Sequence, residues 1–473
     1  MPSIRYVCLS DLHLGADNSL LTAIKPGSIE TDPTRPSAVL TQLGLCLREL
    51  IARNESAEKP TLILNGDILE LALTDVHKAA MVFKCFIELI FPPGGAALFQ
   101  KDILYIPGNH DHHVWESARE TGYLDYLARL QPGDELDAPN HTTPMLSPDF
   151  VREPFLTRLL HIYPHLQDAT VNIAYPNYAL LSQNGQKGVI FSHGHYVESI
   201  YSLMTTLNSM VFPDRKRPTV IRELEAENFA WIDFLWSTLC RSGDVGQNIG
   251  ILYAKLQDND QVGKLTSNVV NNWLAHSHQF RPLKELEAHQ LEMIISSLFN
   301  KIRPLEKLRV DLPLSDDALH GLQWFVQDVV REQLAGENNQ AIPERLSFLF
   351  GHTHKPFQQE MSFTGYPHPL KVYNSGGWVV DTVNLSPLHG AAVLLIDETL
   401  DTISLRMYNQ SDNPRDYAVR VEEIAGSDTA HSAFYSRVNA WVNATRDPWK
   451  TFSETVAEAV VASAHHLQTK ITM

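Results

Sequence analysis

Seven side chains that are able to bind a metal ion stand in short polar motifs along the chain. They are Asp11, His13, Asp67, Asn109, His193, His352 and His354. In the motifs SDLHLG (10–15) and GHTH (351–354), two of these donors lie two residues apart. In an extended segment, residues i and i+2 point to the same side. We therefore predict that each of these two pairs converges on one point, as a metal site requires.

The chemistry of the seven donors suits two divalent ions. The set contains two carboxylates, four imidazoles and one amide oxygen, without a thiolate. Seven protein ligands are too many for one tetrahedral zinc ion, but they suffice for two ions if one carboxylate bridges them. The positive charge of the two ions that their ligands leave uncompensated would attract an anionic phosphate. Mixed nitrogen and oxygen ligation is compatible with Mn, Fe, Zn, Co or Ni and does not choose among them.

The donors follow apolar, β-branched runs of the length that is typical of buried strands. The runs, each with the polar residues that end it, are IRYVCLSD (4–11), TLILNGD (61–67), DILYIPGNH (102–110), KGVIFSHGH (187–195), RLSFLFGHTH (345–354) and LKVYNSGG (370–377). Segments 38–53 and 76–91 have helical spacing and separate the first three runs. This alternation predicts an α/β core with much parallel pairing. In open α/β sheets, ligands gather beyond the carboxyl ends of the strands, where these donors lie.

Helical patterns replace the strand-like runs from about residue 196 to about residue 344. The helical stretches are 197–212, 219–240, 261–278, 284–302 and 316–335, and two further strands, 391–397 and 402–408, follow them. We therefore predict a discontinuous core of residues 1–195 and 345–429, a helical insertion of residues 196–344 and a C-terminal helical tail of residues 430–473. Since the insertion starts behind His193 and ends before His352, we expect it to cap or flank the metal site.

The composition is that of an acidic globular protein. The 473 residues include 38 Lys and Arg against 55 Asp and Glu, which gives a formal net charge of −17. Because a phosphate backbone requires a basic surface, this balance argues against nucleic acid as a partner. The four cysteines have no Cys-x-x-Cys spacing, which argues against a zinc ribbon or a disulfide framework. The N-terminal residues lack the apolar stretch of a signal peptide, and no window is apolar enough for a transmembrane segment, so we expect a cytoplasmic protein.

Five motifs of the chain resemble the five blocks of the calcineurin-like metallophosphoesterase superfamily. They are SDLHLG (10–15), NGD (65–67), GNHD (108–111), SHGH (192–195) and GHTH (351–354), and they occur in the family's order. The resemblance covers residues 1–195 and 345–410. It implies a four-layer α/β/β/α metallophosphoesterase sandwich, which in this chain would carry a large helical insertion.

The resemblance also implies how the donors are divided between the two ions. Asp11, His13 and His354 would hold one ion, while Asn109, His193 and His352 would hold the other. Asp67 would bridge them. In the resembling enzymes, a hydroxide that bridges the two ions attacks phosphorus in line with the leaving group.

His110 and Asp111 are the catalytic residues that the resemblance implies. His110 would face the substrate, either as the general acid for the leaving oxygen or as a cation beside the phosphoryl group, and Asp111 would orient it. A plain turn with a solvent-facing His110 is the alternative.

Three neighbours of these residues complete the expected site. His195 lies two residues after His193, so spacing alone does not choose the ligand; the family pattern favours His193 and places His195 beside the ligands or near the substrate. Glu70 stands where the purple acid phosphatase branch has a metal-binding tyrosine, which argues against that branch. The NSGG motif (374–377) is expected to form a structural turn next to the site.

Together these features predict a hydrolase that cleaves a phosphomonoester or a small phosphodiester with two divalent metal ions. The alternatives are a metal-dependent nuclease and a non-catalytic scaffold on the same core. The insertion carries aromatic side chains, among them Tyr201, Phe212 and Trp236. They are expected to form the insertion's own core or to dock it on the sheets. Other uses are an apolar pocket for a lipid-linked phosphoester and the interface of a homodimer.

Overall fold

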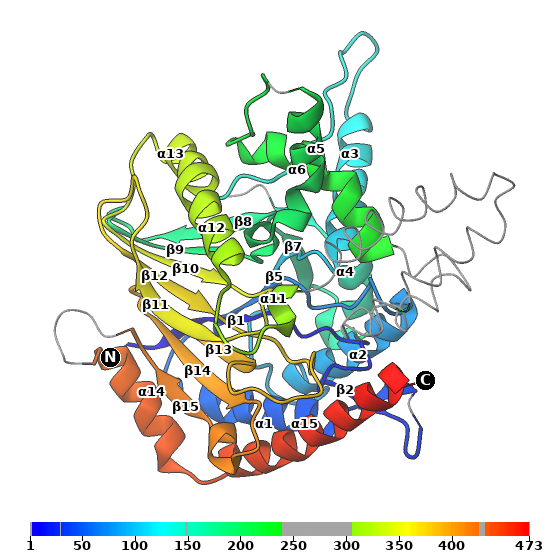
Figure 1. Cartoon of the computed structure of the whole chain (residues 1–473), viewed down its shortest axis with the longest axis vertical. Coiled ribbons are helices and arrows are strands. Elements are labelled where there is room, and N and C mark those ends of the chain that lie inside the picture. Colours follow the sequence, from blue (N-terminus) through cyan, green and yellow to red (C-terminus); the bar gives the residue numbers. More distant parts are fainter. Residues whose placement is uncertain are drawn as a thin grey trace, which may run out of the picture.

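The protein has a mixed α/β fold built around two β-sheets, shown in Figure 1. The computed structural model describes residues 2–28, 30–146, 150–212, 214–238, 305–424 and 431–472, together with Lys264. The predicted helical stretches 261–278 and 284–302 lie outside this description, apart from Lys264. The predicted division into core, insertion and tail therefore stays a prediction.

The larger sheet has eight strands among the described residues. Their order across the sheet is β15 (Arg420–Glu422), β14 (Thr402–Asn409), β13 (Gly390–Asp397), β1 (Ile4–Leu9), β4 (Thr61–Asn65), β5 (Asp102–Ile106), β7 (Thr170–Ile173) and β6 (Val151–Arg152). The neighbours from β1 to β7 are parallel, whereas the strands at both edges are antiparallel. The predicted parallel pairing is thus confirmed for the centre of this sheet.

The smaller sheet has five strands within the described ranges. Their order is β11 (Phe357–Met361), β12 (Leu370–Asn374), β10 (Arg345–Phe350), β9 (Lys187–Ser192) and β8 (Asn177–Leu181). The strands β9, β10 and β12 are parallel, and the two edge strands are antiparallel to them. A separate hairpin pairs β2 (Thr22–Ile24) with β3 (Thr31–Pro36).

All eight apolar runs that were predicted as strands are strands in the structure, and each of the seven donors comes after the end of its strand. The prediction missed β2, β3, β6, β7, β8, β11 and β15. In β11 the sequence FQQEM carries exposed polar side chains, because this strand lies at the edge of its sheet and one face is in contact with water. Such a strand has no buried run that could reveal it.

Helices surround the two sheets. They are α1 (Ala38–Ala52), α2 (Val76–Ile90), α3 (His112–Leu127), α4 (Pro154–Leu160), α5 (Leu203–Val211), α6 (Ile221–Asp233), α11 (Leu305–Leu308), α12 (Asp316–Trp324), α13 (Arg331–Glu337), α14 (Ala433–Ala444) and α15 (Trp449–Thr472). The predicted helices 38–53 and 76–91 are confirmed as α1 and α2. Helix α1 begins where the Ser37 hydroxyl accepts a hydrogen bond from the Leu40 N–H at 2.9 Å and so caps the first turn.

Three apolar clusters hold these elements together. Neighbouring side chains of β1 belong to two of these clusters. Val7 and Leu9 pack in the first cluster with α1, α2 and α15, whereas Cys8 packs in the second. That second cluster lies between the two sheets and includes Ile63 from β4 and Leu349 from β10. A third cluster packs β9, β10 and β12 against α6, α12 and the turns that continue α12. Each sheet is therefore apolar on both faces at its centre.

The elements that the structure describes in the predicted insertion are helices, joined by loops. Short turns at His195–Val197 and Ser199–Ser202 lead into α5, and α6 continues as a π-helical segment at Phe234–Thr238. Another π-helical segment, Phe325–Val330, joins α12 to α13. No helix in the described part of the chain is both long enough and apolar enough to cross a lipid bilayer.

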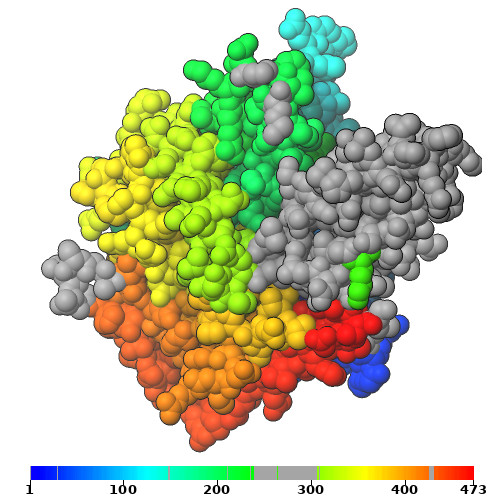
Figure 2. All heavy atoms as spheres, viewed as in Figure 1, coloured from blue at the N-terminus to red at the C-terminus, as the bar shows by residue number. Residues whose placement is uncertain are grey.

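The predicted helical tail consists of α14 and α15. Figure 1 shows both helices running along the same side of the molecule as α1, and Figure 2 shows their atoms as a continuous part of the surface. The buried face of α15 includes Phe452, Val456 and Val460, which belong to the same cluster as α1. The tail is thus packed on the fold and does not extend from it.

Candidate metal centre

All seven predicted donors lie just beyond the carboxyl ends of β1, β4, β5, β9 and β10. Backbone hydrogen bonds join the loops that follow these strands. The Asp11 N–H donates to the Gly66 carbonyl and the Gly351 N–H donates to the His193 carbonyl, both at 2.9 Å. The two sheets thereby bring donors that are more than 300 residues apart in sequence to one place.

The donors converge for a different reason than the one predicted from their spacing. Asp11 and His13 have φ values of 50° and 45°, and His352 and His354 have values of 67° and 58°. These residues lie in the left-handed region and not in an extended strand. Non-glycine residues seldom adopt that region, and such strain collects at functional sites. With similar backbone conformations, Asp11 and His13 join one group, whereas His352 and His354 join two different groups and do not converge as predicted.

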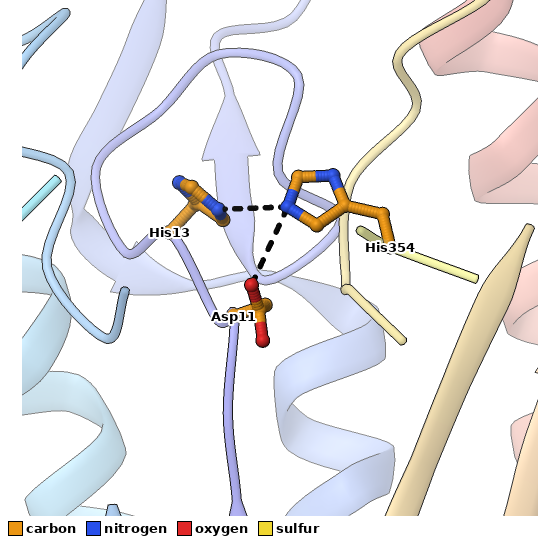
Figure 3. A group of neighbouring side chains, drawn as sticks. All are labelled: Asp11, His13 and His354. Carbon is orange, nitrogen blue, oxygen red and sulfur yellow. Dashed lines mark hydrogen bonds and ion pairs between the residues drawn. The ribbon is translucent and has the colours of Figure 1, made fainter. Parts of the chain in front are cut away.

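The first group consists of Asp11, His13 and His354, which Figure 3 shows pointing toward one another. The His13 Nε2 lies 3.2 Å from the His354 Nε2, and the latter lies 3.5 Å from Asp11 Oδ1. All three side chains are at most 3% exposed. Their three ligand atoms lie within 4.8 Å of one another, which is close enough to surround one metal ion.

The second group consists of Asp67, His193 and His352, and Asn109 adjoins it. The His193 Nε2 lies 3.3 Å from Asp67 Oδ2, 3.3 Å from His352 Nδ1 and 3.0 Å from Asn109 Oδ1. These side chains are also buried. The donors therefore divide as the family resemblance implied, with His354 in one group and His352 in the other.

Asp67 lies between the two groups. Its Oδ2 is 3.6 Å from His13 Nε2 and 3.3 Å from His193 Nε2, and it is buried with no hydrogen-bond partner among the described residues. Its other oxygen, Oδ1, accepts a hydrogen bond from the His110 N–H at 2.8 Å. A buried carboxylate oxygen without a donor is costly unless a cation binds it. The residues thus fit a metal ion on either side of Asp67 Oδ2.

The imidazole rings give a second test of this fit. His13 and His354 each direct Nδ1 toward a carboxylate, at 2.9 Å from Glu70 and 2.5 Å from Asp381, so Nδ1 is the donor in each ring. The two Nε2 lone pairs then face one another at 3.2 Å. This arrangement requires a positive charge between them, either a proton or a metal ion. Carboxylates that orient histidine in this way are usual around protein-bound metals.

A third orienting carboxylate serves the second group. The His352 Nε2 lies 2.7 Å from Glu198 Oε1, which leaves Nδ1 free for a ligand. Glu198 and Asp381 were not predicted from the sequence, and Glu70 was predicted only to depart from the pattern of another family. No spacing signal could have revealed Asp381 or Glu198, because each meets its histidine only through the tertiary fold.

The charges of the site act strongly on its buried acids. Burial by itself would raise the pKa of Asp67, but the rings of His193 and His110 hold it well below its usual range. Burial likewise opposes ionisation of Glu70, but the His110 ring favours it. The pKa of Glu70 therefore falls to about 2. Both carboxylates are therefore ionised at neutral pH and available to bind or orient cations.

Glycine is required before two of the ligands. A Cβ atom at Gly108 would overlap with Asp67 Oδ1, and one at Gly351 would overlap with Asp11 Oδ2. The glycines of the GNHD and GHTH motifs therefore allow the carboxylates of the opposing loops to approach the ligand-bearing backbone.

His110 is buried at 2% exposure, which excludes the alternative of a solvent-facing turn residue. Its Nδ1 lies 2.9 Å from Glu70 Oε1, and its Nε2 is buried without a partner in the described structure. The predicted role of Asp111 as the group that orients His110 is wrong. Asp111 instead accepts hydrogen bonds from the N–H groups of Gly108, Ile68 and Leu69 and from the Tyr105 hydroxyl. Asp111 therefore holds the loop, and Glu70 orients the histidine.

His195 lies beside the ligands without joining either group. Its ring centroid is 5.8 Å from that of His193, and both of its nitrogens are buried without a partner among the described residues. Gly194, with φ of 104°, turns the chain between the two histidines, and no ligand atom of His195 belongs to either group. The choice of His193 as the donor agrees with this geometry.

Residues of the predicted insertion and of the NSGG motif border the site. The Trp236 ring lies 6.0 Å from the His110 ring, and the Tyr201 ring lies 5.1 Å from the His352 ring. The Ser237 hydroxyl donates to the Asn109 carbonyl at 2.8 Å. In the NSGG motif, the Asn374 amide donates to the Gly351 carbonyl at 2.8 Å and braces the loop of the second group. The described residues of the insertion and the NSGG motif therefore lie beside the site, as expected for these parts.

Comparison with known proteins does not identify this site. No protein-family model matches the chain, and no curated protein matches it either. The functional assignment accordingly depends on the motifs and on the geometry described above.

Proposed function

We propose that this protein is a calcineurin-like metallophosphoesterase that uses two divalent metal ions to hydrolyse a phosphomonoester or a small phosphodiester. The observation that carries the proposal is the unpartnered Oδ2 of Asp67, which lies between two buried groups of imidazoles and carboxylates. Mn, Fe and Zn all suit this mixture of nitrogen and oxygen donors.

The residues of the site would divide the work of such a reaction. Bound at the two groups, the ions would supply an activated water as nucleophile and neutralise the charge of the phosphoryl group. Glu70 holds the His110 ring through Nδ1, so that Nε2 is free to give a proton to the leaving oxygen or to stabilise its charge. Trp236 and Tyr201 would border the substrate on the side of the predicted insertion.

The arrangement of the layers supports the same proposal. Helices α1, α2 and α15 pack on one sheet, α6 and α12 pack on the other, and an apolar cluster lies between the sheets. This order supports a four-layer α/β/β/α metallophosphoesterase sandwich with a large helical insertion. The site would lie where the parallel strands of both sheets end.

The alternative functions are a metal-dependent nuclease and a non-catalytic scaffold. A lipid-linked substrate and a homodimer are also proposed. The net charge of −17 counts against a nuclease, and the complete donor set counts against a non-catalytic scaffold. A lipid-linked substrate or a homodimer would find apolar side chains on α5 and directly after it, where Leu207, Val211 and Phe212 are 43%, 68% and 58% exposed.

The test of the function measures bound metal and turnover together. Purified protein loaded with Mn²⁺ or Zn²⁺ should bind two ions per chain and hydrolyse aryl phosphoesters, whereas His352→Ala and Asp67→Asn should lose bound metal and activity. His368→Ala is the matched control, because this histidine is 61% exposed and remote from the donors. The proposal fails if wild-type protein binds fewer than two ions, or if His352→Ala keeps both its metal content and its rate.

A screen of substrates would separate the alternatives. Phosphomonoesters, phosphodiesters, cyclic nucleotides, lipid phosphoesters and single-stranded DNA should be offered to the metal-loaded protein. Preferential turnover of a small phosphoester supports the proposal, whereas preferential cleavage of DNA would establish the nuclease.

A further inference from the structure

His195 is a buried histidine whose ring nitrogens have no partner in the described part of the chain. It is 2% exposed, and neither Nδ1 nor Nε2 forms a hydrogen bond or an ion pair with a described residue. Among the described histidines, it is the one for which both nitrogens are buried and unpartnered. Buried polar atoms in folded proteins are nearly always paired, because leaving them unpaired is costly. The ring therefore indicates that a ligand group binds here.

Ring contacts place His195 against the second metal group. Its ring centroid lies 5.8 Å from that of His193 and 5.6 Å from that of Tyr201. The His352 ring lies 5.1 Å from the Tyr201 ring and 5.2 Å from the His193 ring. The four rings thus form a closed cycle that contains both imidazole donors of the second group. His195 therefore lies beside these donors, next to Tyr201 from the predicted insertion.

His195 does not perform the tasks of the other histidines at the site. No ligand atom of His195 belongs to a metal group, and no carboxylate within the described ranges orients its ring. By contrast, four site histidines each have one nitrogen between 2.5 and 2.9 Å from a carboxylate oxygen, namely His13, His110, His352 and His354. The hydrogen-bonding capacity of His195 is thus not used by the described part of the protein.

The chemistry of the imidazole ring indicates which group would meet it. A neutral imidazole has one donor and one acceptor nitrogen, and a protonated one has two donors. A hydroxyl group both donates and accepts, so it can pair with either nitrogen in each form of the ring. A phosphoryl oxygen of the ester only accepts, and the two metal ions would already hold it. A hydroxyl group in the alcohol part of the substrate therefore fits His195 best.

We propose that His195 binds a hydroxyl group in the alcohol part of the ester, so that the site prefers phosphate esters of sugars or polyols over those of simple alcohols. This inference rests on the proposed function. A site that is built to bind a substrate hydroxyl rejects the analogue without it, because its own buried polar group is then left unpaired. His195 would thereby determine specificity, separately from the proton transfer proposed for His110.

The variants His195→Phe, His195→Asn and His195→Gln test this role. His195→Phe keeps a ring beside Tyr201 but removes both nitrogens, whereas the amides of Asn and Gln retain a donor and an acceptor. His165→Phe is the matched control, because His165 has a ring contact with Tyr163, donates from Nε2 to the Phe91 carbonyl at 2.9 Å and belongs to neither metal group. Metal content is measured first. Then kcat/KM is measured for glycerol-3-phosphate, ribose-5-phosphate, glucose-6-phosphate and propyl phosphate.

In the wild type, at least one of the three hydroxylated esters should have a kcat/KM about 10- to 100-fold above that of propyl phosphate. His195→Phe should keep two metal ions and lose most of this preference, while kcat/KM for propyl phosphate falls by less than about 3-fold. His195→Asn or His195→Gln should retain more of the preference, and His165→Phe should retain all of it. Because His195 has no hydrogen bond to lose in the described structure, the urea midpoint of His195→Phe should not fall.

The inference is overturned if the active wild type shows no preference for a hydroxylated ester. It is also overturned if His195→Phe keeps the preference, since ordered water and not the substrate would then meet the ring. Loss of the same factor for all four esters would indicate a structural role and would overturn it as well. Should His195→Phe fail to fold, His195→Leu takes its place. Failure of the proposed function is distinct, because the wild type would then bind fewer than two ions or hydrolyse none of the esters.

Discussion

Glu70 connects the metal centre to the group that would protonate the product. One of its oxygens lies 2.9 Å from His13 Nδ1, and the other lies 2.9 Å from His110 Nδ1. A single carboxylate therefore sets the ring orientation of a metal ligand and of a proposed catalytic residue. It also sets which nitrogen of each ring carries the proton, since a carboxylate accepts and does not donate.

We predict that Glu70→Gln lowers kcat by about 10- to 100-fold, the loss that is usual when a group that orients a metal site is changed. If His110 is a general acid, both His110→Ala and Glu70→Gln should lose most activity on esters with poor leaving groups. The measurement is kcat against the pKa of the leaving group in a series of aryl phosphates. Asp381→Asn is the comparison, because Asp381 orients the candidate metal ligand His354 and accepts from the Asn18 amide, so its loss should weaken metal binding without changing that dependence. An unchanged kcat in Glu70→Gln across the series contradicts the role.

At the scale of the elements, helix α6 carries a buried acid into the interior. Glu225 is fully buried and accepts a hydrogen bond from the Tyr175 hydroxyl at 3.0 Å. Burial raises the pKa of Glu225 from its ordinary value of 4.5 to about 8. The folded protein therefore binds this proton more tightly than the unfolded chain does. The stability that this bound proton contributes to the folded protein is fully present below about pH 4.5. It decreases as the pH rises toward 8.

Glu225→Gln removes this titration and keeps an acceptor for Tyr175. Relative to wild type, the variant should gain stability between pH 5 and pH 8 by up to about 1.4 kcal/mol for each pH unit. Urea unfolding of the metal-free protein at several pH values gives the comparison. Glu223→Gln is the control on the same helix, because Glu223 is exposed. If the free energy of unfolding changed with pH in the same way in wild type and in Glu225→Gln, the titration of Glu225 would not be the cause.

The short helix α11 is held by a buried ion pair. Glu306 and Lys355 have side chains that are 3% and 1% exposed, and Glu306 also accepts from the Ser315 N–H at 3.1 Å. Removing one partner leaves the other charge buried without compensation, which typically destabilises a protein by about 3–5 kcal/mol.

A double-mutant cycle tests this pair. Glu306→Gln and Lys355→Met should each lower the free energy of unfolding by about 3–5 kcal/mol, and the double variant should lose less than the sum of the two. Lys450→Met and Glu454→Gln remove an exposed ion pair in α15 and should change stability by less than about 1 kcal/mol. Additive losses at Glu306 and Lys355 would show that the pair does not act as a unit.

At the scale of the whole molecule, the C-terminal tail completes the apolar core. Its side chains Phe434, Val438, Trp449, Phe452 and Val456 are at most 5% exposed and pack in the cluster that also contains α1 and α2. Burial of each large apolar side chain contributes about 1.5–3 kcal/mol, and a folded protein is stable by only about 5–15 kcal/mol in total. The tail therefore accounts for a large part of the net stability.

Deletion of residues 431–473 should accordingly prevent recovery of folded protein. Near-ultraviolet circular dichroism and urea unfolding report the outcome. Deletion of residues 471–473 alone is the control, since it keeps the ion pair of Lys470 with Asp17 and the whole buried face of α15. A stable, cooperatively unfolding protein without residues 431–473 would contradict this view of the tail.

The sequence by itself determined the central strands of both sheets and the polar residues that follow them. Apolar runs such as IRYVCL and RLSFLF predict buried strands because their side chains must leave water, and the polar residues that end them are readable without any tertiary contact. The same reasoning recovered β1, β4, β5, β9, β10 and the donors that follow them. It could not recover the exposed edge strand β11, whose place depends on its neighbour β12.

The tertiary structure alone decided how the donors group and what orients them. His352 and His354 belong to two different groups, although their i and i+2 spacing predicts that they converge. Glu70 took the role predicted for Asp111, since the orientation of a ring depends on which carboxylate the packed loops bring near it. Asp381 and Glu198 entered the site for the same reason. Chemistry is carried by residue types along the chain, but its geometry arises only where distant loops meet at the ends of two packed sheets.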